Sequence, residues 1–384
     1  MPDVISDVNL VVLTNTEGEK MASSKRNLLR LIGIKKPIIQ APMAGVSTPE
    51  MAAAVTNAGG LGSLGVGAMT AENARTTIEK TQQLTTGPIN INVFCHPPAE
   101  QNVAVNAAWM TWLTPQFAPY GVTAPTELRE IYTSFLEDEA MLNVILERKP
   151  KVVSCHFGLP SSDAMRALKA AGIVLIASAT SVEDARMLID ANIDGIIAQG
   201  YEAGGHRGVF DTAAEDLHIG SLALTRLLVK RSDTPVITAG GVMDGAGILA
   251  CLALGAQAAQ LGTAFVPCTE SAIDDGYRAA LCSPAAFRTV MTSAISGRPA
   301  RAIANRFTKI GEDLAMPAIP AYPIAYDAGK ALHAAAKASG EGGYGAQWAG
   351  QAAALARALS AAELVRRLSD EMAEALAQLN TLHA

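Results

Sequence analysis

The chain has 384 residues, of which 49% are hydrophobic and 17% are charged. This composition is typical of a compact globular protein and argues against intrinsic disorder. The net charge of −6, with dispersed basic residues, argues against nucleic-acid binding, and no apolar run reaches the roughly 18 residues that a membrane helix needs.

The first 24 residues differ from the rest, because residues 14–24 are polar and show no helical or strand period. We expect residues 1–24 to be a disordered extension, or to precede an alternative start at Met21. The five cysteines are odd in number and include no C-x-x-C pair. Together with the lack of a recognisable signal peptide, this predicts reduced thiols and a cytoplasmic protein.

From residue 37 onward, short apolar runs alternate with longer helical patterns. Eight runs are predicted strands: 37–41, 61–65, 89–94, 151–156, 173–177, 195–199, 235–239 and 258–262. Six segments between them are predicted helices: 48–58, 71–83, 161–171, 181–191, 220–230 and 244–254. Thr48 and Ser181 precede acidic first turns, as helix N-caps do. Gly172 and Gly255 stand where glycines commonly end helices.

Strands that are apolar throughout and alternate with helices are typical of a parallel sheet buried on both faces. Eight strands within about 230 residues favour a closed (β/α)8 barrel of the TIM type. An open doubly wound sheet is the alternative.

The predicted barrel spans residues 25–270, with an insertion at 95–149 between the third and fourth strands. Prolines are frequent in the first half of this insertion, and a helix is predicted at 126–147. The C-terminal segment 271–384 is predicted to be mainly helical. We expect it to form, with part of the insertion, a substrate subdomain over the barrel mouth.

Glycines follow the last two predicted strands. In barrels of this type the active site lies in the loops at the carboxyl ends of the strands. Backbone N–H groups at Gly240–Gly241 and Gly262–Thr263 could surround a phosphate in front of a helix N-terminus. The same glycines would also be required if they only formed tight turns, so a purely structural role stays open as the alternative to a phosphate site.

Two amides, Asn92 and Gln199, stand at the ends of apolar strands. A buried amide costs free energy unless its polar atoms are paired. A flavin ring, with alternating donors and acceptors, would suit them. Hydrogen bonding to neighbouring loops is the alternative.

Two histidines also follow strand ends. Gly204 and Gly205 precede His206 and would allow a ligand to approach the backbone closely, with the imidazole at a loop tip. His156 ends the fourth strand. It would either contact a substrate or be a core histidine that hydrogen-bonds to the backbone.

Tyr322, Tyr326 and Lys330 are spaced i, i+4 and i+8. On a helix they would share one face, where two phenols and an ammonium could bind an anion. An amphipathic surface face is the alternative. We find no metal-ligand spacing such as H-E-x-x-H or paired cysteines, so no metal is expected.

These segments together resemble the nitronate monooxygenase family, formerly called 2-nitropropane dioxygenases, and in particular its class I. The segments that carry the resemblance are QAPMAGVSTPEMAAAVTNAGGLGSLG (40–65), NINVFCHPP (90–98), VVSCHFGLP (152–160), AQGYEAGGHRG (198–208), TAGGV (238–242), QLGTAF (260–265), SGRPAR (296–301) and YPIAYDAGK (322–330). The APM and EAGGH motifs are shared with FMN-dependent enoyl and quinone reductases of the same superfamily. NINVFCHPP, SCHFGLP and the Tyr–Tyr–Lys face favour the nitronate monooxygenases.

The resemblance implies a non-covalent FMN. The implied flavin-binding residues are Ala41, Pro42, Met43, Asn92, Gln199, Gly204, Gly205, Gly240, Gly241, Gln260, Leu261, Gly262 and Thr263. It also implies that His206 is the catalytic base towards neutral nitroalkanes. His156, Tyr322, Tyr326 and Lys330 would then lie on the substrate side.

The implied reaction oxidises alkyl nitronates, propionate 3-nitronate above all, with O2 and without NAD(P)H. The products would be a carbonyl compound and nitrite or nitrate. The expected partners are therefore small molecules, with no nucleic acid or membrane, and a homodimer is the candidate assembly. Two alternatives remain open: an NAD(P)H-dependent FMN reductase of enoyl or quinone substrates, and a phosphate-binding barrel without redox chemistry.

Overall fold

The computed structural model describes residues 27–381, so the extension predicted at 1–24 lies outside the described residues. Its centre is a parallel sheet in the order β1-β9-β8-β6-β5-β4-β3-β2. A parallel bridge between Ile39 and Leu61 joins the two outer strands, which closes the sheet into a barrel. The strands are β1 (Ile38–Gln40), β2 (Gly62–Gly65), β3 (Ile89–Phe94), β4 (Val152–His156), β5 (Val174–Ala179), β6 (Gly195–Gln199), β8 (Val236–Ala239) and β9 (Ala258–Leu261). All eight predicted strands are confirmed, and the closed barrel replaces the open-sheet alternative.

The six predicted barrel helices are also confirmed. They are α3 (Pro49–Asn57), α4 (Ala71–Leu84), α7 (Ser162–Ala170), α8 (Val182–Asp190), α9 (Ser221–Arg231) and α10 (Gly245–Ala253). The Thr48 side chain accepts a hydrogen bond from the backbone N–H of Met51, as an N-cap should. Gly172 and Gly255 adopt φ values of +80° and +99°, the left-handed conformation that ends a helix.

A short helix, α2 (Leu28–Ile32), closes the end of the barrel at the amino termini of the strands. Leu28 and Ile32 are fully buried against strand residues that include Ile176 and Ile197. This end is therefore an apolar floor, and the carboxyl ends of the strands are left as the place for a polar site.

The insertion forms α5 (Val103–Phe117), the short 3-10 turn η1 (Ala118–Tyr120) and α6 (Glu139–Arg148). The helix predicted at 126–147 is therefore wrong over 126–138. In that stretch the backbone bonds to other elements instead of to itself: the N–H of Arg129 reaches the Asp327 carboxylate, and the N–H of Phe135 reaches the Phe94 carbonyl. Helix α5 forms in spite of Pro115 because Trp109, Leu113 and Phe117 on it are buried.

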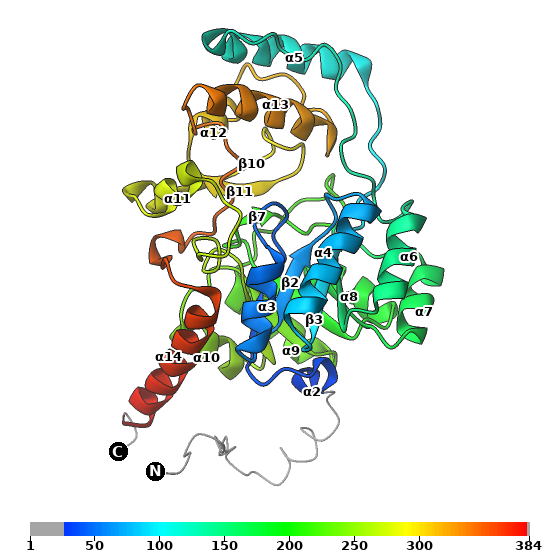
Figure 1. Cartoon of the computed structure of the whole chain (residues 1–384), viewed down its shortest axis with the longest axis vertical. Coiled ribbons are helices and arrows are strands. Elements are labelled where there is room, and N and C mark those ends of the chain that lie inside the picture. Colours follow the sequence, from blue (N-terminus) through cyan, green and yellow to red (C-terminus); the bar gives the residue numbers. More distant parts are fainter. Residues whose placement is uncertain (1–26, 382–384) are drawn as a thin grey trace.

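The C-terminal segment contains strands as well as helices. Its elements are α11 (Asp275–Leu281), η2 (Pro284–Phe287), β10 (Thr289–Thr292), β11 (Ala300–Ile303), α12 (Arg306–Ile310), α13 (Ile324–Ala338), η3 (Ala353–Leu355) and α14 (Ala361–Thr381). β10 and β11 form an antiparallel sheet with β7 (Gly205–His206), which the sequence did not lead us to expect. Above the barrel mouth, α5 packs on α13 through a cluster that includes Trp109 and Leu332 (Figure 1).

Helix α14 departs from the expected placement of the C-terminal segment. Its residues Leu364 and Leu368 are buried beside Ile248 and Cys251 of α10, on the flank of the barrel. Only the part of the segment before α14 therefore reaches over the mouth, and the predicted domain boundaries stay a prediction. Within residues 27–381, no helix is both long and apolar enough to cross a membrane.

Candidate active site

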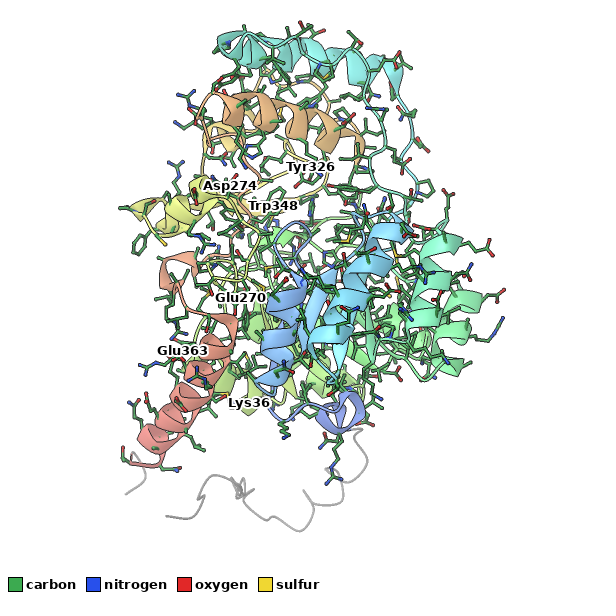
Figure 2. All side chains as sticks on the ribbon, viewed as in Figure 1. Lys36, Glu270, Asp274, Tyr326, Trp348 and Glu363 are labelled. Carbon is green, nitrogen blue, oxygen red and sulfur yellow. The ribbon has the colours of Figure 1, made fainter. Side chains whose placement is uncertain are left out.

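A cavity of about 620 Å³ opens at the carboxyl ends of the barrel strands. Figure 2 shows Tyr326 and Trp348 between α13 and the barrel, where they form part of its lining. The predicted site residues that line it are Ala41, Pro42, Met43, Asn92, His156, Gln199, Gly204, Gly205, His206, Gly240, Gly241, Gln260, Gly262, Thr263, Tyr322, Tyr326 and Lys330. Leu261 does not line it, because its side chain is buried in the core between β9 and α10. The structure thus brings the other predicted residues together around one space.

The loops after β8 and β9 form one side of the cavity. We call Gly240, Gly241, Gln260, Gly262 and Thr263 the glycine cradle. Gly240 and Gly241 have φ values of +109° and +75°, which only glycine adopts without strain. The backbone N–H groups of Gly241, Gly262 and Thr263 have no acceptor within the described part of the chain. These donors lie free for a ligand, as a phosphate site requires.

Gln260 adds an unpaired acceptor to the glycine cradle. Its Oε1 is buried and has no hydrogen-bond partner among residues 27–381. A buried amide oxygen without a partner costs free energy, and a ligand that donates a hydrogen bond would remove that cost. The cradle thus offers free donors and one free acceptor, which fits a phosphate-bearing flavin.

The other two amides are already paired. The Gln199 Nε2 donates to the His206 carbonyl at 2.9 Å, and its Oε1 accepts from the Gly208 N–H at 2.7 Å. The Asn92 Nδ2 donates to the carbonyl and hydroxyl of Ser154, both at 3.0 Å. Gln199 therefore holds β7 and the residues after it, and Asn92 joins β3 to β4. Any contact between these amides and a flavin stays a prediction.

Glu202 supports the loop after β6 from behind. Both oxygens of its carboxylate accept from the backbone N–H of Ser221, at 3.0 and 2.8 Å, at the start of α9. A carboxylate at a helix N-terminus is stabilised by the free N–H groups there. Glu202 thus anchors the loop between β6 and β7.

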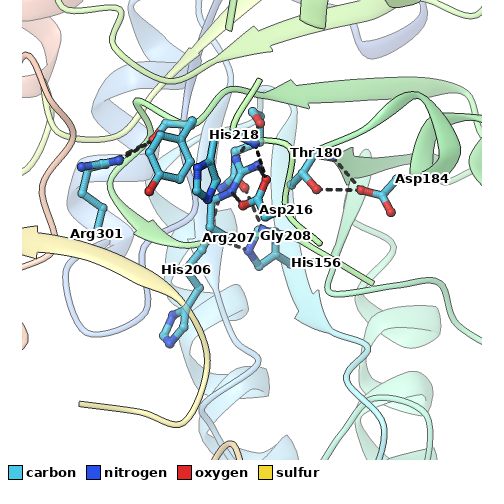
Figure 3. Close-up of polar contacts among 11 residues, drawn as sticks. His156, Thr180, Asp184, His206, Arg207, Gly208, Asp216, His218 and Arg301 are labelled. Atoms are coloured by element: carbon cyan, nitrogen blue, oxygen red, sulfur yellow. Dashed lines mark hydrogen bonds and ion pairs between the residues drawn. The ribbon is translucent and has the colours of Figure 1, made fainter. Parts of the chain in front are cut away.

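His206 lies on β7, paired with Ala300 of β11, and not at a free loop tip as expected. Figure 3 shows its ring directed away from the Arg207 side chain, which binds Asp216 with nitrogen–oxygen distances of 2.8 and 3.0 Å. The alternation of a strand places neighbouring side chains on opposite faces. β7 therefore fixes which way the imidazole points.

A serine from the β10–β11 connection sets the tautomer of His206. The Ser296 hydroxyl donates to the Arg298 carbonyl at 3.3 Å, so its oxygen accepts from the His206 Nε2–H at 2.9 Å. This network places the hydrogen on Nε2 and leaves Nδ1 with its lone pair. Burial, followed by the positive fields of His156, Arg298 and His96, lowers the pKa of His206 to about 3. The ring is neutral at physiological pH.

Both nitrogens of His156 are engaged by protein groups. Its Nε2 donates to the His206 carbonyl at 3.2 Å, and its Nδ1 accepts from the Ser178 hydroxyl at 3.0 Å. Burial lowers its pKa to about 4, so this ring is neutral too. His156 thus supports the backbone of β7, and its predicted contact with substrate stays a prediction.

Aromatic side chains and a lysine line the side of the cavity formed by α13 and the segments beside it, in contrast to the backbone groups of the glycine cradle. We call Tyr132, Tyr322, Tyr326, Lys330 and Trp348 the aromatic wall. The Lys330 Nζ lies 4.9 Å from the centre of the Tyr132 ring and 5.4 Å from that of Tyr326. Such cation–π contacts hold the ammonium where it faces the cavity. Burial lowers the pKa of Lys330 from its ordinary value of 10.5.

The predicted Tyr–Tyr–Lys face is real but is not all helical. Tyr322 precedes α13, which begins at Ile324, and its hydroxyl is buried without a partner within residues 27–381. Its ring centre lies 5.3 Å from that of His206. A donor that is buried and free beside the histidine is suited to bind an oxygen of a ligand.

Sequence reasoning missed Tyr132, Trp348 and Ser296. Tyr132 fell inside the wrongly predicted helix of the insertion, and Trp348 lies in an irregular glycine-rich stretch without period. Ser296 opens the SGRPAR segment, which the resemblance quoted without a role. That segment was the signal that could have found it.

Comparison with known protein sequences shows the family of the chain. The model of the nitronate monooxygenase family matches residues 25–371. A nitronate monooxygenase of Paraburkholderia phytofirmans is 64% identical over 93% of this chain and 98% of its own length. One of Pseudomonas aeruginosa is 51% identical over 89% of this chain and 98% of its own.

Solved structures show the same likeness. A nitroalkane oxidase from Streptomyces ansochromogenes is 40% identical, with a TM-score of 0.84 over 92% of this chain and 100% of that one. FabK from Thermotoga maritima is 28% identical, with a TM-score of 0.70 over 93% and 99%. The family match covers most of the chain, including both sides of the cavity. This chain therefore belongs to the nitronate monooxygenase family of oxidoreductases.

Proposed function

We propose that this chain oxidises alkyl nitronates with O2, uses a non-covalent FMN and does not require NAD(P)H. One observation carries the proposal: a single cavity has free backbone donors on one side and a cation with phenols on the other. The first arrangement suits a phosphate-bearing cofactor, and the second suits a small organic anion.

The glycine cradle would hold the flavin. The free N–H groups of Gly241, Gly262 and Thr263 would bind its phosphate, and the unpaired Oε1 of Gln260 would accept from a donor of the ligand. Bound FMN would supply an acceptor for the electrons of the nitronate and a route for them to O2.

The aromatic wall would bind the substrate. A nitronate carries its negative charge on the two oxygens of the nitro group. The Lys330 ammonium would offset that charge, and the free Tyr322 hydroxyl would donate to one oxygen. Positioning and charge compensation are what these residues contribute, because a nitronate is already ionised.

The state of His206 favours an ionised substrate over a neutral one. A general base acts best when its pKa lies near the working pH, whereas that of His206 is lowered to about 3. Its free Nδ1 would accept the α-proton of a neutral nitroalkane, but only as a weak base. A nitronate has already lost its α-proton, so its oxidation does not depend on a strong base.

The test uses the purified protein in anaerobic mixing. We expect a yellow protein whose flavin absorbance falls when propionate 3-nitronate is added and does not change quickly when NADPH is added. The APM and EAGGH motifs are shared with FMN-dependent enoyl and quinone reductases, so an NAD(P)H-dependent reductase is the second candidate. Rapid loss of flavin absorbance with NADPH alone would support that candidate against the proposal. A colourless protein that binds no FMN would contradict both.

A further inference from the structure

Arg298 is a buried cation that the proposed function does not use. It lies in the SGRPAR segment, between β10 and β11, and is 5% exposed. Within residues 27–381 its guanidinium makes one hydrogen bond, from Nη1 to the Val209 carbonyl at 3.3 Å, and no carboxylate there forms an ion pair with it. Arg207 is equally buried but has Asp216 as its partner. A buried charge without a counter-ion is costly, so this position calls for an explanation.

The guanidinium lies directly behind the lining of the cavity. It is 4.4 Å from the centre of the Phe157 ring, and that ring lies 5.4 Å from Tyr322 and 5.7 Å from His206. Phe157 has a φ of +71°, which is strained for an aromatic residue and typical of functional sites. Arg298 and Phe157 thus form a second layer behind two residues that face the ligand space.

The turn that carries Arg298 is held in position by close packing against the backbone before α13. Gly297 has a φ of +94°, and a Cβ there would lie 2.6 Å from the Pro320 carbonyl oxygen and 2.7 Å from the Tyr322 nitrogen. Glycine therefore lets the turn pack tightly against the backbone that leads into α13. This contact couples the position of Arg298 to that of Tyr322.

The surrounding groups leave the charge of Arg298 uncompensated. The field of Arg298 contributes to lowering the pKa of His206, His156 and His96, after burial, so all three rings are neutral. Tyr322 is a neutral phenol, since burial raises its pKa. In a buried site of low effective dielectric, such a charge acts over several ångströms. The positive potential therefore extends into the cavity from behind Phe157.

We propose that Arg298 sets the preference of this site for anionic substrates, by supplying a fixed positive charge behind Phe157 and Tyr322. It is a positioning residue, because Phe157 separates it from the ligand space. The inference rests on the proposed function for the identity of the anion, a nitronate. That an anion is bound at all can be tested without turnover.

The first experiment measures binding of nitrate, a planar and unreactive anion, by isothermal titration calorimetry on the purified protein. We expect Arg298→Gln to weaken nitrate binding about tenfold and Arg298→Lys, which keeps the charge, to change it much less. Arg301→Gln is the matched control, because Arg301 is also buried and stacks at 4.7 Å on Tyr201, outside the cavity lining. It should leave nitrate affinity unchanged.

The second experiment compares ethyl nitronate with nitroethane, which share a carbon skeleton and differ in charge. Arg298→Gln should raise the KM for the nitronate about tenfold. It should not lower kcat/KM for nitroethane, because it removes a positive field that weakens His206 as a base. Equal losses on both substrates, or equal damage by Arg298→Lys and Arg298→Gln, would show a structural role and overturn the proposal.

The two experiments separate this inference from the proposed function. Weaker nitrate binding in Arg298→Gln, with Arg298→Lys close to wild type, supports the anion preference even if the wild-type protein oxidises no nitronate. Unchanged nitrate binding overturns it even if nitronate oxidation is found. Arg298→Met provides a second neutral variant that keeps the apolar stem, for use if Arg298→Gln does not fold.

Discussion

The two sides of the cavity present different kinds of polar groups. The glycine cradle presents backbone N–H groups and one amide oxygen, none of which titrates. The aromatic wall presents side chains, among them a cation and buried phenols, with neutral imidazoles beside it. Backbone groups are fixed by the fold, whereas each side chain can be removed or charged alone. The cradle should therefore tolerate changes of pH, and the wall should respond to both pH and substitution.

The largest expected effect is on stability at acid pH. Burial lowers the pKa of His96 and His156 to about 4 and that of His206 to about 3, below the ordinary value of 6.5. The unfolded chain therefore binds up to three more protons, and stability is lost as the pH falls from about 6.5 towards 4. Linkage gives a loss of about 5 kcal/mol between pH 7 and pH 5. Denaturant titrations at both pH values measure it.

A single variant sharpens this first prediction. Neither nitrogen of His96 has a partner within the described residues, and its ring lies 5.0 Å from that of Tyr322. His96→Phe should remove about a third of the pH dependence and cost little stability at pH 7, because no hydrogen bond is broken. An unchanged slope with pH would show that His96 is not among the groups that destabilise the fold in acid.

His206→Asn should separate neutral from ionised substrates. It removes the free Nδ1, so we expect kcat/KM for nitroethane to fall about 100-fold, as for loss of a general base, and that for ethyl nitronate to fall far less. Steady-state oxygen uptake on both substrates measures the difference. If both fell equally, the assignment of His206 as a base would be wrong.

Lys330→Met should lower turnover of the anionic substrate and leave flavin binding unaffected. The variant keeps much of the apolar stem and removes the ammonium that stacks on Tyr132 and Tyr326. A hydrogen bond to a charged group contributes about 1.5–3 kcal/mol, so we expect kcat/KM for ethyl nitronate to fall about 20-fold. Flavin content should not change. A loss of flavin in this variant would break the division of the cavity into two sides.

Gly241→Ala makes the complementary change on the cradle. We expect FMN to bind about tenfold more weakly, because a Cβ at φ +75° strains the loop that presents the free N–H groups. Gly33→Ala is the control, since Gly33 has a φ of +84° and open space around it, on the far end of the barrel. Both variants should lose similar stability. Similar loss of FMN from both would refute the role of the cradle.

The barrel could be predicted from sequence because its signals are local. Apolar strand runs and caps such as Thr48 placed the eight barrel strands and the six predicted barrel helices within two residues of their bounds, whereas α2 and β7 were not predicted. The structure of the insertion and of the C-terminal segment over the barrel mouth could not be predicted, because it depends on contacts between segments that are distant in the sequence. Residues 126–138 bond to β3 and α13 instead of forming a helix, and Tyr132 was missed with them.

For the site, the positions of residues could be predicted from the sequence, but their hydrogen-bond partners could not. Residues at or just after the ends of barrel strands, such as Gln260 and Gly240, lie at the cavity as the barrel requires. The partners of those residues were not visible. Gln199 is paired with His206 of β7 and with Gly208 just after it, the protein-bound alternative that the sequence left open. Leu261 faces the core because side chains alternate along β9. Only the folded chain shows which polar atoms stay free.

Oxygen uptake tests the central claim most directly. The purified protein is mixed with propionate 3-nitronate in air, without NAD(P)H, and oxygen and nitrite are measured in the same sample. The account predicts that oxygen is consumed only when the nitronate is present, that nitrite appears, and that added NADPH does not change the rate. Absence of nitronate-dependent oxygen uptake, together with NADPH oxidation by an enoyl or quinone acceptor, would contradict it.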